Sequence, residues 1–335
     1  MPEFNPMISI PDIADISVVE AKLRYENGLA KMKAEDFLSA IEDLNRTIEL
    51  NPSFFKAYSQ RGFVKIQLLD YDGAIEDCNK ALEIEPIHSW GYHVRGISKY
   101  KLSDCLSAIN DLNKAIELSP DRAISYFVRA VFLDRIGNYK EVLADLNEGI
   151  RLDPTKADSF NNRGIIHRRL GNDSASLKDY DMAIKLDGTM SKAYLNRGCI
   201  KESAGNASGA IADYNKAIRI DPKYINAHHR RSMLKYKLED WKGSIAYFTK
   251  AIKIDSESIY VYFFRGISKL NMDNYKGAIK DFTIVLTLNP QDYRAYSFRG
   301  KAKKSAGDAI GAEIDFKRAD ELRSKTVNTV ITDGS

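Results

Sequence analysis

The 335-residue sequence has little of what marks a disulfide-rich or membrane-spanning protein. Its three cysteines, Cys78, Cys105 and Cys199, lie far apart and form no Cys-x-x-Cys pair, so neither a disulfide framework nor a zinc ribbon is predicted. No run approaches the roughly 18 consecutive apolar residues that a bilayer span needs, and the first residues do not resemble a signal peptide. We therefore expect a cytoplasmic protein without a transmembrane segment.

Signals for catalysis are also missing. The sequence has no glycine-rich phosphate loop, no HExxH and no GxSxG, and none of its five histidines has another at i+4. Adjacent His228 and His229 would project about 100° apart on a helix and could not form a two-ligand metal site. We predict no active site, no metal site and no cofactor, and hence a protein that is not an enzyme.

No excess of one charge points to a partner, because 50 Lys and Arg stand against 46 Asp and Glu. The distribution is uneven, however: residues 1–88 hold 9 basic and 16 acidic side chains, whereas residues 191–326 hold 26 and 15. Two alternatives follow from this asymmetry. The basic C-terminal third could bind RNA or an anionic surface, although interleaved acids make nucleic acid unlikely, or opposite ends of two chains could associate into a homo-oligomer.

What the sequence does contain is a 34-residue period. Near-copies of one phrase, such as AIEDLNRTIELNP and AIADYNKAIRIDP, recur at this spacing and end on Pro52, Pro86, Pro120, Pro154, Gly188, Pro222, Ser256 and Pro290. From residue 21 to residue 326 the chain accommodates nine units without insertion or deletion.

Each unit has the pattern of a helical hairpin. Apolar residues at helical spacing fill the first half, as in Ala57, Tyr58 and Ile66, and again the second half, as in Ala74 and Cys78. Turn residues separate the halves, and the closing proline stops the second helix because it cannot donate a backbone hydrogen bond. Glycine recurs at position 8 of the unit and alanine at position 20, which predicts that the two helices approach closely there.

The period and this pattern of small, aromatic and proline residues resemble the tetratricopeptide repeat family over about nine-tenths of the chain. The resemblance implies an all-α fold, a right-handed α-solenoid (superhelix) of tandem helical hairpins. We expect an N-terminal extension or cap at 1–20, a flexible tail at 327–335, and between them nine repeats: 21–54, 55–88, 89–122, 123–156, 157–190, 191–224, 225–258, 259–292 and 293–326.

Charged residues also recur with the period. Arginine occupies position 7 of repeats two to nine, and aspartate occupies position 23 of every repeat except the seventh, which has Tyr247. The first repeat has Asn27 instead of arginine and is the only one without a predecessor. We therefore predict that each arginine pairs with the aspartate of the preceding repeat, which leaves Arg265 facing Tyr247. An arginine row that binds an anionic ligand is the alternative.

The resemblance further implies that the first helix of each repeat lines a concave groove, through positions 2, 5, 6, 9, 12 and 13. Asn162 and Asn196 share position 6, where an amide can bond a peptide backbone of any sequence, as in the asparagine ladders of other tetratricopeptide repeat grooves. Surrounding cations would favour acidic or phosphorylated ligands, and aromatic residues would receive apolar ones. The candidate groove residues are Trp90, Tyr100, Phe127, Asn161, Asn162, Arg168, Arg169, Lys192, Asn196, Asn226, His229, Arg230, Tyr236 and Phe263.

Asparagine and arginine are also ordinary on a solvated helix face, and Phe127 and Phe263 could instead pack between helices. The leading hypothesis is a scaffold or adaptor that binds an extended or helical peptide segment of another protein in this groove.

Overall fold

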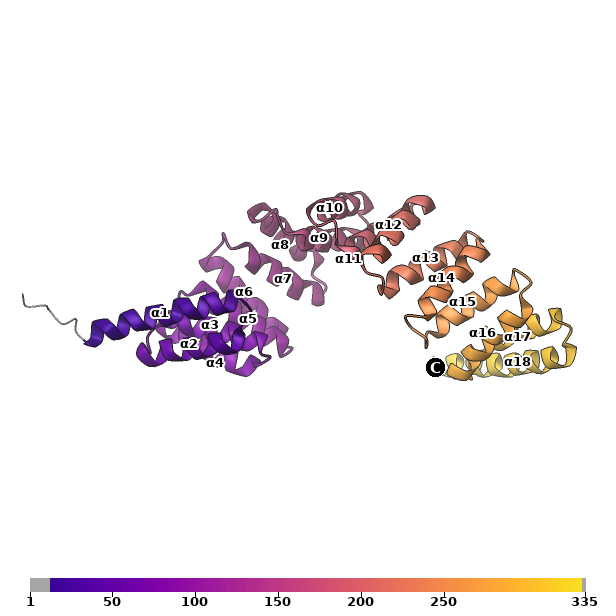
Figure 1. Cartoon of the computed structure of the whole chain (residues 1–335), viewed down its shortest axis with the longest axis horizontal. Helices are drawn as coiled ribbons and strands as arrows, with labels where there is room; N and C mark the ends of the chain where they lie inside the picture. The colour runs from indigo at the N-terminus through magenta and orange to yellow at the C-terminus, as the bar shows by residue number, and fades with distance from the viewer. Residues whose placement is uncertain (1–12, 333–335) are drawn as a thin grey trace, which may run out of the picture. The chain divides into compact units, whose positions relative to one another are not determined.

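The computed structural model describes residues 13–332, and side chains within 17–324. Over this range the chain is all-α, as predicted, and its helices follow one another with short connections (Figure 1). The helices are α1 (Ile13–Lys33), α2 (Phe37–Leu50), α3 (Phe55–Gln67), α4 (Tyr71–Ile84), α5 (Ser89–Lys101), α6 (Cys105–Leu118), α7 (Ala123–Arg135), α8 (Tyr139–Leu152), α9 (Ala157–Arg169), α10 (Asp173–Leu186), α11 (Ser191–Ser203), α12 (Ala207–Ile220), α13 (Ile225–Lys237), α14 (Trp241–Ile252), α15 (Ile259–Leu270), α16 (Tyr275–Leu288), α17 (Tyr293–Ser305) and α18 (Ala309–Thr332).

The helices form two compact units, Met1–Ile166 and His167–Ser335, and the division falls within α9. In the first unit each helix from α1 to α8 packs against the next one along the chain, and in the second unit the same holds from α10 to α18. Odd-numbered helices are the first helices of the predicted repeats, and even-numbered helices are the second. The prediction of tandem helical hairpins is thus confirmed in each unit.

The turn inside each hairpin is set by two adjacent positions of the repeat. Position 15 has a left-handed backbone, with φ of 77° at Gly171 and 65° at Leu69. Position 16 is aspartate or asparagine, and its side chain caps the second helix in every described repeat except the fourth, where Asn138 makes no capping bond; Asp70 Oδ1, for example, accepts the Gly73 N–H at 2.9 Å. These two residues end one helix and start the next.

The small residues at positions 8 and 20 do bring the paired helices together. A Cβ atom added to Gly62 would lie 3.1 Å from the Ala74 carbonyl oxygen, and one added to Gly96 would lie 3.1 Å from that of Ala108. Both distances are shorter than ordinary van der Waals contact, so these glycines set the spacing of the two helices.

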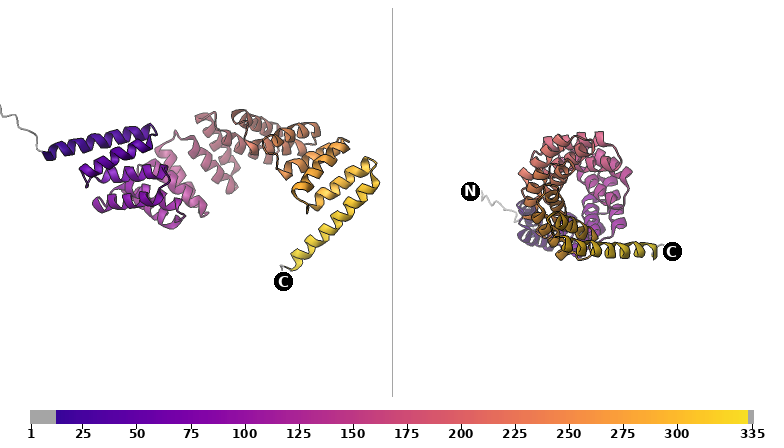
Figure 2. Two further views of the ribbon diagram at one scale, coloured as in Figure 1. Left: turned by 60° about the horizontal axis from the view of Figure 1, so that its bottom comes forward. Right: turned by 90° about the vertical axis from the view of Figure 1, so that its right-hand side faces the viewer.

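The helices at the two ends of the array are longer than the repeat predicts. Helix α1 begins at Ile13, within the expected extension at 1–20, of which residues 1–12 lie outside the described part. Helix α18 extends well past its partner α17 to Thr332, beyond the expected limit at residue 326 and into the segment expected to be a flexible tail (Figure 2). No proline follows Pro290, and position 32 of the last repeat is Ser324, so nothing in the sequence stops this helix.

The arginines at position 7 pair with aspartates, but not with the ones predicted. Arg265 Nε and Nη2 donate to the two carboxylate oxygens of Asp281, in its own repeat, at 2.8 and 2.7 Å. The same geometry recurs for Arg61–Asp77, Arg95–Asp111, Arg129–Asp145, Arg197–Asp213 and Arg299–Asp315. The predicted pairing with the preceding repeat is therefore wrong.

The preceding repeat contributes a different group. The third guanidinium nitrogen, Nη1, donates to position 25 of that repeat, as from Arg61 to Asn45 Oδ1 at 2.7 Å and from Arg265 to Thr249 Oγ1 at 3.2 Å. Each of these arginines thus closes its own hairpin with two bonds and joins it to the previous hairpin with one. This is a structural role, since a bidentate arginine–carboxylate pair uses the donors that a ligand would need.

Arg231, in the seventh repeat, is the exception. It is the arginine that faces Tyr247, with its guanidinium carbon 3.8 Å from the ring centre, whereas Arg265 was predicted to do so. Its Nη1 donates to Asn215 Oδ1 at 2.7 Å, but its Nε and Nη2 have no hydrogen-bond partner although the residue is only 6% exposed. Burial lowers the pKa of Arg231 from its ordinary value.

Candidate functional site

Four successive first helices of the second unit share one pocket. The end of α9 together with α11, α13 and α15 encloses about 520 Å³. We call it the groove pocket; it is lined by Arg168, Leu195, Asn196, Cys199, Glu202, Asn226, His229, Arg230, Met233, Lys237 and Tyr260. Every one of these residues stands at position 2, 5, 6, 9, 12 or 13 of its repeat, the positions that the family resemblance assigned to the groove.

The groove pocket brings together five of the predicted site residues: Arg168, Asn196, Asn226, His229 and Arg230. Asn226 and Arg230 are exposed, and Arg168 and Asn196 are half-buried. Helical spacing explains the grouping, because positions 2, 5, 6, 9, 12 and 13 form one face of a helix. Lys192 and Arg169 are exposed outside this pocket.

Two predicted groove residues are buried and a third is half-buried. Asn161 is 4% exposed and Phe263 is 8% exposed. The ring of Phe127 packs on Gly149 of α8, where an added Cβ would collide with it. All three stand at position 5, and the packing of Phe127 and Phe263 is the alternative that the sequence analysis left open; their role in a groove stays a prediction.

The remaining aromatic candidates have partners within their units. Trp90 stacks on His93 with ring centres 4.7 Å apart, and Tyr100 stacks on Phe132 at 3.8 Å. Tyr236 meets Phe264 edge to face at 5.0 Å. Each ring is partly buried by these contacts and offers less open surface than the sequence suggests.

Glu202 was missed by the sequence reasoning, although it stands at position 12, one of the groove positions. Its Oε1 accepts a bond from Lys237 Nζ and its Oε2 one from the Tyr214 hydroxyl, both at 2.7 Å. Burial alone would raise the pKa of Glu202, but these two bonds outweigh it and the pKa is lowered. The carboxylate is therefore charged, and both of its oxygens are already bonded.

His229 lies at the side of the groove pocket with its ring edge-on to Tyr260, the ring centres 4.5 Å apart. Burial, and then the nearby Arg230 charge, lower the pKa of His229, so the imidazole is neutral at pH 7. Its Nε2 is buried and has no hydrogen-bond partner. A buried polar atom without a partner is uncommon in folded proteins, and this one borders a pocket that a ligand could enter.

Arg168 and Arg230 give the groove pocket its charge. Within residues 17–324 neither guanidinium has a carboxylate at ion-pair distance, unlike Arg197, Arg265 and Arg299 of the same unit. Arg168, Arg230 and Lys237 against Glu202 give the lining a formal charge of +2.

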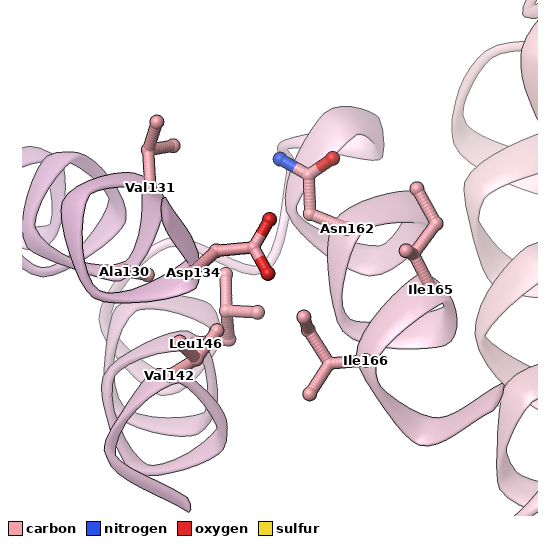
Figure 3. Close-up of a pocket in the computed structure, with 8 residues that line it drawn as sticks. All are labelled: Ala130, Val131, Asp134, Val142, Leu146, Asn162, Ile165 and Ile166. Atoms are coloured by element: carbon pink, nitrogen blue, oxygen red, sulfur yellow. The ribbon is translucent and has the colours of Figure 1, made fainter. Parts of the chain in front are cut away.

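The first unit has a smaller and more apolar pocket, of about 220 Å³, between α7, α8 and α9 (Figure 3). We call it the apolar pocket; its walls are Ala130, Val131, Val142, Leu146, Ile165 and Ile166. Figure 3 shows the Asp134 carboxylate directed from α7 toward α9, which carries Asn162. Asn162, the predicted partner of Asn196 in an asparagine ladder, thus lines a different pocket, and the ladder remains a prediction.

Among the residues that the structure describes, no three His, Cys, Asp or Glu side chains are grouped so that they could hold a metal ion. Within that same range no helix combines the length and apolar character needed to span a membrane.

The fold and the groove face define a helical repeat protein. Models of the tetratricopeptide repeat match residues 55–88 and 191–224, and a second model of that repeat matches residues 93–157. The chain is a tetratricopeptide repeat protein, of a fold that generally mediates protein interactions without catalysis. No curated protein matches it in sequence.

Solved structures of similar fold include the pilF protein of Pseudomonas aeruginosa and a tetratricopeptide repeat protein of Parabacteroides merdae. The first is 16% identical with a TM-score of 0.56, and the aligned region covers 65% of this chain and 97% of the pilF chain. The second is 17% identical with a TM-score of 0.53 and covers 74% and 98%. At such identities the likeness concerns the fold alone.

Proposed function

We propose that the protein is a non-enzymatic scaffold that binds an extended or helical segment of another protein along the first-helix face of its second unit. The groove pocket carries this proposal, because four successive first helices contribute polar side chains to one cavity. Interaction scaffolding is the general role of tetratricopeptide repeats, and the polar lining of the groove pocket supports the proposal that this face binds the partner.

The exposed polar groups of the groove pocket suit a peptide. The Asn226 amide offers one acceptor and two donors, which can bond a backbone carbonyl and N–H whatever the side chains are. Arg168 and Arg230 add two cations, which favour acidic or phosphorylated residues in the bound segment. Leu195, Cys199 and Met233 supply an apolar floor.

A pull-down from cell lysate tests the proposal. The wild-type chain is compared with an Asn226→Ala, Arg230→Ala double variant and with Arg219→Ala, which removes an exposed arginine of α12 that does not line the groove pocket. We expect specific partners to be lost from the double variant and kept by Arg219→Ala. Capture of the same proteins by all three chains would refute binding at the groove pocket.

A further inference from the structure

We propose that the groove pocket is a phosphate site, which takes the phosphorylated side chain of the bound segment. This inference rests on the proposed function, since it names the chemistry that the same pocket recognises. It follows from the balance of charge and of hydrogen-bonding groups in the pocket.

The net positive charge of the pocket lining favours a ligand that carries more than one negative charge. Three cations and the single carboxylate of Glu202 line the groove pocket, and His229 is neutral. Lys237 forms an ion pair with Glu202, whereas Arg168 and Arg230 form none within residues 17–324, although Arg230 lies near enough to Glu202 to help lower its pKa. One carboxylate from a ligand would neutralise only one of them, whereas a phosphate monoester carries about 1.5 to 2 negative charges at pH 7.

The hydrogen-bonding groups that remain open are mostly donors. Both oxygens of Glu202 are occupied by Lys237 and Tyr214. Within residues 17–324 the guanidinium groups of Arg168 and Arg230 are without carboxylate partners, and burial raises the pKa of Tyr260 so that its hydroxyl keeps its proton. The unpaired His229 Nε2 adds a donor in the tautomer that carries its proton there. A ligand group with several acceptors and no donor fits such a lining, and a phosphate dianion has three terminal oxygens.

Size and geometry agree with this assignment. About 520 Å³ leaves room for a phosphorylated serine or threonine together with the neighbouring backbone. The two arginines come from different first helices, α9 and α13, so a phosphate between them could accept a bidentate pair of bonds from each planar fork. Lysine would act there only as a point charge, which makes arginine the residue suited to this role.

Isothermal titration with three blocked pentapeptides tests the inference on the full chain. The peptides share a poly-alanine sequence with phosphoserine, glutamate or serine at the centre, and each is titrated to 10 mM at pH 7.5, where the phosphate is dianionic. We expect the phosphoserine peptide to bind at least tenfold more tightly than the glutamate peptide. Arg168→Gln and Arg230→Gln should each weaken it at least tenfold.

Arg219→Gln is the matched control, because it removes the same charge from an exposed site outside the groove pocket. Its affinity should stay within twofold of wild type, and thermal unfolding of all variants verifies that they fold. Equal affinity for the glutamate and phosphoserine peptides, or no heat from either at 10 mM, would overturn the inference. So would an equal loss in Arg219→Gln, or tighter binding of a uridine oligonucleotide than of the phosphopeptide.

Failure of the phosphate site can be separated from failure of the proposed function. If partners from phosphatase-treated lysate are captured by the wild type and lost from the Asn226→Ala, Arg230→Ala variant, the groove binds a partner but not through phosphate. If capture depends on intact phosphorylation as well as on these two side chains, both proposals stand.

Discussion

Removal of the position 7 arginine should have unequal consequences in neighbouring repeats, a large loss of stability in one and little change in the other, and the pair Arg265→Met and Arg231→Met makes the contrast measurable. Methionine keeps an unbranched side chain of similar length without the charge. Arg265 is paired with Asp281, whereas Arg231 has two guanidinium nitrogens without partners. The substitutions therefore remove the same group from two different electrostatic surroundings.

In Arg265→Met the carboxylate of Asp281 stays buried, with a side chain only 1% exposed, and keeps only Lys269 Nζ at 2.8 Å as a charged partner. Breaking one side of a buried pair costs about 3–5 kcal/mol, and the remaining lysine puts the expected loss near the lower limit, about 3 kcal/mol. Since about 1.4 kcal/mol corresponds to a factor of ten, local opening should become roughly 100 times more frequent.

In Arg231→Met the favourable and unfavourable contributions to the free energy of unfolding nearly cancel. Loss of the hydrogen bond to Asn215, which is 2.7 Å long, costs about 1.5–3 kcal/mol, and loss of the stacking on Tyr247 costs about 1 kcal/mol. Against this, two buried donors without partners are removed, which relieves about 1–3 kcal/mol each. The net change should lie within about 1 kcal/mol, or roughly a fivefold change in opening.

Hydrogen exchange followed by mass spectrometry on the full chain is the suitable assay, because a repeat array opens locally and has no single unfolding free energy. Peptides from α15 and α16 report on Arg265→Met, and peptides from α13 and α14 report on Arg231→Met. Tyr247→Asp should slow exchange in α13 and α14, because it supplies the missing carboxylate. Equal acceleration by both arginine substitutions, or faster exchange in Tyr247→Asp, would refute the reasoning.

Two further predictions concern the first unit. Burial lowers the pKa of His93 to about 4, so the unfolded chain binds a proton more readily between pH 6.5 and 4 and stability falls as the pH is lowered through that window. Hydrogen exchange of α5 peptides at pH 7 and pH 5, corrected for the intrinsic exchange rate, should show a loss of about 2 kcal/mol in local opening free energy from this residue. A His93→Asn variant with the same pH dependence as wild type would contradict it. Leu69→Gly should stabilise its hairpin by about 1 kcal/mol, because Leu69 is 71% exposed at a φ of 65° that glycine adopts without strain. Gly171→Leu is the converse control and should destabilise its hairpin. A lower thermal midpoint for Leu69→Gly would show that the side chain of Leu69 matters more than its backbone conformation.

The hairpins could be predicted from the sequence because they depend on local periodicity. Positions 8 and 20 bring two helices together within one repeat, and the turn at positions 15 and 16 needs only its own residues. The polar side chains of the groove pocket came from the family resemblance instead, which implies the groove positions of the repeat, and Arg168, Asn196, Asn226 and Arg230 stand at four such places in the sequence.

The arginine pairing could not be predicted from spacing alone. Arg61 lies between two second helices, α2 and α4, and both carry an aspartate at position 23, so the period fits either partner. The signal that could have decided it is position 25, where Asn45, Asn79, Asn113 and Asn147 supply the acceptor for the next repeat's arginine. Glu202 was missed for a related reason: its role depends on Tyr214 and Lys237, which lie in different helices.

Arg230 and Arg231 show that the position of a residue around a helix decides whether its side chain faces the groove pocket or packs inside the fold. They are adjacent in sequence, yet about 100° of rotation per residue places Arg230 on the exposed face of the groove pocket and buries Arg231 against α14. The paired position 7 arginines bind aspartates of their own hairpins, so their guanidinium groups are not available to bind a ligand. Among the described side chains of the second unit, Arg168 at position 12 and Arg230 at position 6 have no such partner, which is the basis for proposing that the two cations of the groove pocket bind an anionic group of a ligand.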